Sequence, residues 1–499
     1  MNKDLSEKIN EYGAKVDSLV MNRDYEGLKS LLDEMIDFLG ENNTAKEDAS
    51  FNYYFGTGLG TYADYLVRTG RDYFDEEVVS LRSTSMYHFR RARNLYNPKM
   101  HRDPRAKLRL LTNYANEIDT IGRVIEALRI YREILDVNEE FSIALGNYGR
   151  AISFLANMVN DTGHYRDLHC YAYQAIKKAI NTPDPDMHEQ AIKAFEEQIN
   201  EYEESPSARI LAEPIRYDEH LLGDDCEERD YRRWCLEKHL FLNPMNEVRE
   251  IETAFAHDPL TITSYTEFVG EKELAEKTAT NPPRWYAMLN QLKEEYVYAR
   301  YQFYEGNKNG DVHFADKEVK LSLASYDYSN YSIRIEQIKS AYRGLYSMLD
   351  QISFFINDFW KLGLGEKQAD AYHVYNAKNY PRDNIALGSL YWVLREFYET
   401  YKGAEQASEK KISILRNALE HKYVKVHGCE WGGKLQIDDD NFYHISEEDL
   451  KKYTMRLLQL CRESLIYLVY AIGIDDSKKD KSEKVANLSV SDFPDDWKL

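Results

Sequence analysis

The sequence has 499 residues, of which 43% are hydrophobic and 30% are charged. This composition is that of a globular chain rather than a disordered one, and the length suffices for two or three domains with sizeable cores. The formal net charge of −21 works against general affinity for nucleic acid, which needs clustered lysine and arginine, so any such contact must be local.

The chain carries no signal of export or of membrane insertion. Residues 1–8 are polar and lack the apolar core of a signal peptide, and the apolar run 465–474 is too short to span a bilayer. The five cysteines are odd in number and lack the spacing of a zinc site or a disulfide framework. We therefore expect a cytoplasmic protein with no membrane partner, no metal site and no cofactor.

Residues 1–205 predict a series of amphipathic helices, with scarce strand signals. The block 111–115, Leu-Thr-Asn-Tyr-Ala, recurs 34 residues later at 145–149 as Leu-Gly-Asn-Tyr-Gly. A 34-residue period is that of tetratricopeptide (TPR) helix pairs, which stack into a solenoid with a free concave face. The pattern predicts a TPR-like helical repeat domain whose concave face would dock a protein or peptide partner.

Two features of this part have both a functional and a structural interpretation. The glycines of 56–60, Gly-Thr-Gly-Leu-Gly, resemble a phosphate loop, but no strand precedes them, which favours close packing of helices. The chain also has 40 tyrosines, whose rings could stack on bases. Their positions in the helical pattern favour packing for most of them.

Residues 206–283 form a less regular linking segment, punctuated by prolines at both ends and acidic over 217–230. Residues 284–474 predict a helical bundle, and the charged tail 475–499 is expected to be mobile. Residues 330–361 are predicted to be the longest helix, and Ser446 with Asp449 would form a capping box. The predicted bundle helices are 285–300, 330–361, 384–401, 409–427 and 446–472.

The predicted helix 409–427 carries the most distinctive side chains of the chain. Asn417 and His421 are four residues apart and lie one above the other, next to Arg416. An arginine can hold a phosphate, and an imidazole can move a proton near neutral pH. The helix therefore presents groups suited to phosphate chemistry.

The spacing of Arg416 and His421, with Asn417 after the arginine, resembles the Arg-x4–6-His signature of the HEPN superfamily, many of whose members are metal-independent ribonucleases. The resemblance covers residues 231–472. Within the superfamily, the chain is similar to a bacterial subfamily in which TPR-like helices precede the HEPN bundle. It implies an all-α fold, with the TPR-like solenoid followed by a HEPN-type bundle. It also implies a homodimer formed through the bundle, with two copies of the motif across the interface.

Cleavage of RNA without a metal needs a base for the ribose 2′-hydroxyl and a cation for the charge that develops on the phosphate. The resemblance implies that His421 is the base, that Arg416 binds the phosphate and that Asn417 orients the imidazole. In HEPN proteins a polar residue of an earlier helix supports the arginine. Asp350 is the candidate for this role, and a surface carboxylate is the alternative.

Three lysines near the motif, Lys411, Lys422 and Lys425, form a local basic strip that could bind RNA, although a solvated helix face would look the same. Tyr423 completes the spacing at which one toxin–antitoxin branch of HEPN proteins is modified by a nucleotidyltransferase. A tyrosine of the RNA groove or of the core is the alternative.

Two functions fit the sequence. One is a metal-independent endoribonuclease, active in phage defence or as a toxin and regulated by the TPR-like part as a sensor or docking domain. The other is a non-catalytic protein that uses the repeats for interaction and the bundle for dimerisation. The intact Arg416, Asn417 and His421 favour the first function, and the negative net charge favours the second.

Overall fold

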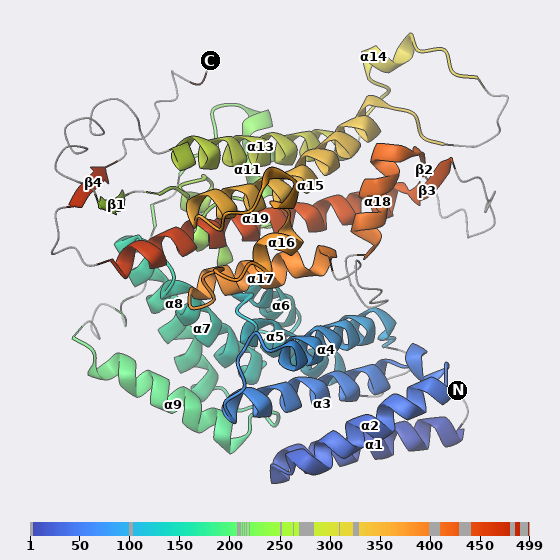
Figure 1. The fold of residues 1–499 in the computed structure, drawn as a ribbon, viewed down its shortest axis with the longest axis vertical. Helices are drawn as coiled ribbons and strands as arrows, with labels where there is room; N and C mark the ends of the chain where they lie inside the picture. The colour runs from blue at the N-terminus through green and yellow to red at the C-terminus, as the bar shows by residue number, and fades with distance from the viewer. Residues whose placement is uncertain are drawn as a thin grey trace. The chain divides into compact units, whose positions relative to one another are not determined.

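The structure of the chain is a computed structural model. It describes residues 3–98, 103–206, 211, 213, 215, 217–218, 220–249, 252–262, 264–268, 284–308, 310–322, 329–398, 410–428, 441–479, 485–489 and 498. This part is helical apart from two short two-stranded sheets, which confirms the predicted all-α class (Figure 1). The chain divides into two compact units: Met1–Asn157 with Tyr165–Ile215, and Arg216–Lys402 with Met158–His164 and Glu409–Leu499.

The first unit is a succession of helices, three of which begin at an aspartate cap. Asp24, Asp48 and Asp75 each accept a hydrogen bond from a backbone N–H of the first helical turn, which satisfies one of the four unpaired N–H groups there. Its helices are α1 (Lys3–Asn22), α2 (Tyr25–Glu41), α3 (Ala49–Arg68), α4 (Glu76–Leu95), α5 (Ala106–Thr120), α6 (Val124–Val137), α7 (Ser142–Ala156), α8 (Thr162–Asn181) and α9 (Glu189–Glu204), with the 3-10 turn η1 (Ala45–Glu47).

Each helix of α3–α7 packs on the next one, and alternate helices also touch: α1 with α3, α3 with α5, and α5 with α7. Tyr114 and Tyr148, which match across the 34-residue period, are both buried. At Gly149 a Cβ atom would lie 2.9 Å from the carbonyl oxygen of Ala172, so this glycine permits close approach of α7 and α8. These contacts suit stacked helix pairs, and the TPR-like class itself stays a prediction.

The glycine-rich stretch 56–60 lies inside α3, and the helix-packing interpretation is correct. A Cβ atom at Gly56 would lie 3.2 Å from the carbonyl oxygen of Ser85 on α4, and one at Gly58 would lie 2.9 Å from Leu32 on α2. The small residues thus let α3 approach its two neighbours, and they form no phosphate loop.

The second unit contains the predicted bundle. Its helices are α11 (Cys226–Glu237), α13 (Arg284–Asn307), α14 (Phe314–Lys317), α15 (Ile333–Phe359), α16 (Ala371–Tyr375), α17 (Ile385–Tyr398), α18 (Lys410–His421) and α19 (Glu447–Ser477). Its 3-10 turns are η2 (Pro244–Glu247), η3 (Thr253–Phe255) and η4 (Glu366–Gln368). Strand β1 (Ser264–Phe268) pairs antiparallel with β4 (Val485–Ser489), and β2 (Tyr423–His427) pairs parallel with β3 (Phe442–Ser446).

Three sequence predictions about this unit are wrong. Helix 409–427 ends at His421, because Tyr-Val-Lys-Val-His alternates with β-branched residues and forms β2 instead. The longest helix is α19 with 31 residues, against 27 for α15. Within the predicted mobile tail, 475–477 continue α19 and Val485–Ser489 form a strand. Most of the remaining tail, and residues 429–440 between β2 and β3, lie outside the described residues.

Helix α19 is the core of the second unit. Its start was predicted correctly, since the Ser446 side chain accepts a hydrogen bond of 3.0 Å from the Asp449 N–H. By length and composition α19 could cross a membrane, but 83% of its most apolar window is buried in the fold. It packs against α13, α15 and α17, as a core helix of a bundle does (Figure 1).

A buried arginine of α19 holds the segment that precedes the bundle. Arg462 is 3% exposed and pairs with buried Glu247, while its Nε and Nη2 donate to the carbonyl oxygens of Phe241 (2.6 Å) and Asn243 (3.0 Å). Each of the three guanidinium nitrogens thus has a hydrogen-bond partner in this one segment.

Arg300 of α13 holds the same segment from a second helix. It donates to the carbonyl oxygen of Leu240 and to both carboxylate oxygens of Asp258 at 2.8–2.9 Å. Burial opposes ionisation of Asp258, but the Arg300 guanidinium outweighs it and lowers the pKa of this carboxyl. Residues 240–258 are therefore part of the bundle's core.

Replacing Arg462 with alanine should remove the ion pair of the buried Glu247 carboxylate. We expect Arg462→Ala to lower the free energy of unfolding by about 3–5 kcal/mol, as for other broken buried ion pairs. Chemical denaturation followed by circular dichroism measures this. Lys478→Ala, which removes the exposed pair with Asp383, is the control and should cost under about 1 kcal/mol. Equal effects of the two substitutions would contradict the anchoring role.

Candidate functional site

The motif helix α18 is held in place by side chains of α15 that bind its main chain. The Tyr342 hydroxyl donates to the carbonyl oxygen of Ile412 (2.7 Å), and Arg343 donates to that of Leu419 (3.2 Å). The apolar face of α18 is buried as well, including Leu415 at 0% exposure and Ala418 at 3%. Together these contacts fix both the axial position and the rotation of the helix.

Arg416 lies half-buried on the side of α18 that faces α15. Its guanidinium carbon is 5.3 Å from the ring centroid of Tyr346, a cation–π contact, and its Nη1 donates to the Asn417 side-chain oxygen at 3.1 Å. Asp350 follows Tyr346 by one turn of α15 and is also half-buried. The Arg416 side chain is thus restrained by Tyr346 and Asn417, while part of its guanidinium group remains accessible to solvent.

Asp350 is near enough to feel the charge of Arg416 but forms no direct ion pair with it. Burial raises the pKa of the Asp350 carboxyl above its usual value; Arg416 opposes this rise and Asp370 adds to it. The predicted supporting role would therefore act through the electric field at Arg416, without a hydrogen bond between the two groups in this structure.

The Asn417 side chain is hydrogen-bonded to Arg416, and not to the His421 imidazole that it was predicted to orient. Its side-chain oxygen accepts the hydrogen bond from Arg416, because these neighbours in sequence lie closer than the four-residue step to His421. His421 is the last residue of α18 and is exposed, with no hydrogen bond or ion pair to the rest of the described chain. The imidazole is accordingly free to meet a ligand.

The four predicted substrate-binding residues fall into two places. Lys422, Tyr423 and Lys425 follow His421 directly, at the junction of α18 and β2. Lys411 lies at the other end of α18, about 15 Å from His421 along the helix axis. The structure thus gathers the first three beside His421 and leaves Lys411 apart.

Sequence reasoning missed two residues that shape this site. Tyr346 lies on the same face of α15 as Arg343 and Asp350, and this spacing of three and four could have indicated a shared face towards the motif. Phe442 of β3 lies beside Tyr423, with ring centroids 5.6 Å apart. Its role depends on strand pairing, which no local pattern predicts.

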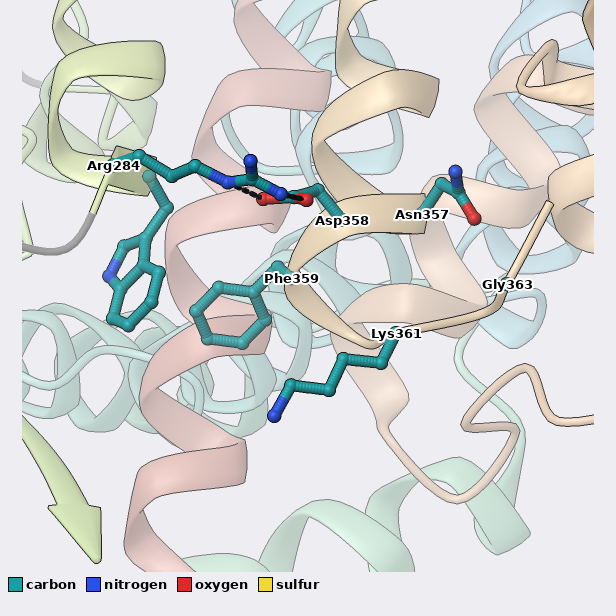
Figure 2. A pocket seen from close by; sticks show the side chains of 7 residues that line it. Arg284, Asn357, Asp358, Phe359, Lys361 and Gly363 are labelled. Atoms are coloured by element: carbon teal, nitrogen blue, oxygen red, sulfur yellow. Dashed lines mark hydrogen bonds and ion pairs between the residues drawn. The ribbon is translucent and has the colours of Figure 1, made fainter. Parts of the chain in front are cut away.

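A separate pocket of about 430 Å³ lies where the start of α13 meets the end of α15 (Figure 2). Arg284 is neutralised by its ion pair with Asp358, and the rings of Trp285 and Phe359 meet edge to face at 5.4 Å. Lys361 adds a positive charge next to these rings. The pocket is nine helical residues from Asp350, about 14 Å along α15, so it is not part of the motif site.

Asn357 of α15 belongs to this pocket. Its side chain donates to the carbonyl oxygen of Leu364 and accepts from the Leu364 N–H, both at 3.0 Å. It therefore closes the turn after α15 and takes no part in the motif site.

Over the part of the chain that the structure describes, no group of three or more His, Cys, Asp or Glu side chains is placed to hold a metal ion. Four cysteines, Cys170, Cys226, Cys235 and Cys461, are free thiols. The polar groups that the motif site itself offers are a guanidinium, an amide, an imidazole, a carboxyl and amines.

Comparison with known families agrees with this arrangement. Residues 276–475 match the model of the LA2681-like HEPN family, which supports the assignment of this segment to the HEPN superfamily. HEPN domains are typically ribonucleases, and they commonly dimerise and bind RNA. No curated protein and no solved structure matches the chain.

The raised pKa of Asp350 predicts a pH dependence of stability. Because the folded state holds this proton to a higher pH than the unfolded state does, stability falls as pH rises from the unfolded pKa of about 3.9 through the raised value. Asp350→Asn removes this titration. We therefore expect the variant to gain stability relative to the parent between pH 4 and pH 7.5, measured by denaturant unfolding.

The opposite result would be informative as well. If Asp350→Asn were the less stable protein at pH 7.5, the carboxylate would be stabilised by Arg416 by more than its burial costs. The direct supporting pair implied by the family resemblance would then form in solution.

Proposed function

We propose that the protein is a metal-independent endoribonuclease whose site is formed by Arg416 and His421. The observation that carries this proposal is the arrangement on α18: a guanidinium restrained by Tyr346 and Asn417, followed at the helix end by an exposed imidazole. The match of 276–475 to a HEPN family supports it. The function in phage defence or as a toxin belongs to the same proposal.

In the proposed reaction the imidazole of His421 takes the proton of a ribose 2′-hydroxyl. The 2′-oxygen forms a bond to phosphorus and the bond from phosphorus to the 5′-oxygen breaks. The 5′-oxygen then receives a proton from the imidazolium or from water. Arg416 stabilises the charge that grows on the phosphate oxygens. The products are a 2′,3′-cyclic phosphate and a 5′-hydroxyl.

We further propose that two copies of the bundle pair, so that two motifs face one groove, and that the helices of residues 1–205 dock the protein or peptide that triggers cleavage. The net charge of −21 favours a non-catalytic interaction protein as the second candidate. The experiment below separates the two, since an interaction protein would leave RNA intact.

Purified protein incubated with total RNA in EDTA should cleave it. His421→Ala should lower the rate by about 10²–10⁴-fold, because base catalysis is typically worth that much. Arg416→Ala should cause a loss of similar size, since the guanidinium meets the charge of the transition state. His313→Ala, at a half-buried histidine that caps the N-terminus of α14, is the control and should keep the parental rate.

Two results would contradict the assignment. Cleavage that EDTA abolishes and magnesium restores would require a metal mechanism. A His421→Ala protein with the rate of the His313→Ala control would remove His421 from the reaction.

Dimerisation through the bundle predicts that a fragment without the first unit still pairs. The fragment must begin near Arg216, because Arg300 and Arg462 need their partners between 240 and 258. We expect both Arg216–Leu499 and the full chain, whose mass is 58.6 kDa, to sediment as dimers in analytical ultracentrifugation. A monomeric but folded fragment beside a dimeric full chain would place the interface in the first unit.

A further inference from the structure

The parallel pair β2–β3 separates its side chains onto two faces, because successive residues of a strand point to opposite sides. Val426 and Ile445, which pair in the ladder, are 1% and 7% exposed and point into the fold. Their neighbours Tyr423, Lys425 and Phe442 therefore lie on the other face. We call this face, with His427 and His444, the ribbon face.

The accessible end of the ribbon face consists of two rings and one amine, those of Tyr423, Phe442 and Lys425. The Tyr423 ring is 5.6 Å from that of Phe442, and the Lys425 Nζ lies 4.0 Å from the Phe442 centroid. Further along, the rings of His427, which is 8% exposed, and His444 lie nearly in one plane and share a hydrogen bond of 2.9 Å between Nε2 and Nδ1. Tyr423 is 72% exposed, which is unusual for a ring of this size and leaves a π-face in solvent.

Both edges of β2 already have hydrogen-bond partners. A ligand would therefore contact the side chains of this strand and not its backbone. One edge carries β3, and on the other Asn330 donates its N–H to the carbonyl oxygen of Val426 at 2.7 Å. Added strands therefore cannot pair with β2. What remains is a surface of aromatic rings and amines, with no carboxylate among its ladder positions.

This chemistry fits unpaired nucleotides. Bases stack on aromatic side chains, and amines next to the rings meet the phosphates. Lys422, exposed and without an ion pair to any described residue, adds a cation at the start of the face. In a chain of net charge −21, such a concentration of positive and aromatic groups is complementary to an anion with flat rings.

The position of the ribbon face links it to the motif site. Tyr423 is two residues after His421, and from Tyr423 to His427 the strand is about 13 Å long. A chain whose phosphate lies at Arg416 and His421 would therefore continue along the rings. Paired bases are stacked inside a duplex and cannot present their faces to these rings.

We propose that the ribbon face stacks the unpaired bases next to the scissile phosphate, so that the substrate is single-stranded RNA. The placement next to a scissile phosphate rests on the proposed function, whereas binding of single-stranded RNA can be measured without cleavage. Phe442 is the central residue of this subsite, because it contacts both Tyr423 and Lys425.

The test uses the full chain with His421→Ala, so that bound RNA stays intact, and measures fluorescence anisotropy with a labelled 12-nucleotide RNA, single-stranded or annealed to its complement. Phe442→Leu, which keeps an apolar side chain but removes the ring, should weaken binding of the single strand about 10-fold to 100-fold. It should leave the duplex affinity unchanged. Phe314→Leu, at a 78% exposed ring on α14, is the matched control and should bind as the parent does.

Lys425→Met provides a second measurement that does not depend on stacking. It should lower the slope of log affinity against log salt by about 0.7, the value for one phosphate contact of a single strand. Circular dichroism and thermal unfolding of each variant verify that the fold is kept.

The outcomes distinguish the two proposals. Equal affinities for single strand and duplex, or an unchanged single-strand affinity in Phe442→Leu, would overturn the ribbon-face proposal even if the parent protein cleaves RNA. The second of these results is also expected if the face docks a protein. Conversely, ring-dependent binding of the single strand by a parent protein that never cleaves RNA would support the subsite and refute the nuclease.

Discussion

The second unit depends on burying one long helix that still carries a charge at its centre. Most of α19 is surrounded by protein, and Arg462 lies inside this buried stretch. A guanidinium in such a place is tolerated only if it is paired and hydrogen-bonded, which here requires Glu247 and two carbonyl groups of the segment before the bundle. A sequence stretch that resembles a linker is thus an obligatory part of the core.

Two sets of contacts connect α19 to the motif helix α18. Helix α15 packs directly on α19, where the Cys461 thiol donates to the carbonyl oxygen of Leu345 at 3.1 Å. Helix α15 in turn holds α18 through Tyr342 and Arg343. The exposed imidazole of His421 is therefore carried by a rigid support, although it has little contact of its own. This combination places a reactive group accurately while leaving it open to a ligand.

The sequence predicted the features that have a local period. Apolar residues at steps of three and four located the bundle helices, and Ser446 located the start of α19. It failed where a tertiary partner decides the outcome. Tyr423–His427 continue an apolar pattern that a short helix or a strand can satisfy, and pairing with β3 selects the strand. Likewise, the four-residue spacing predicted a hydrogen bond between Asn417 and His421. In the structure the Asn417 side-chain oxygen accepts a hydrogen bond from Arg416 instead.

The register of β2 against β3 has a consequence for how this region can change in length. A slip of the ladder by one residue would turn Val426 outward and drive Lys425 towards the space beside Ile445. Only Lys422 separates the end of α18 from β2, so an insertion of one residue there would reverse which side chains reach solvent. Insertions and deletions between α18 and β2 should therefore be excluded.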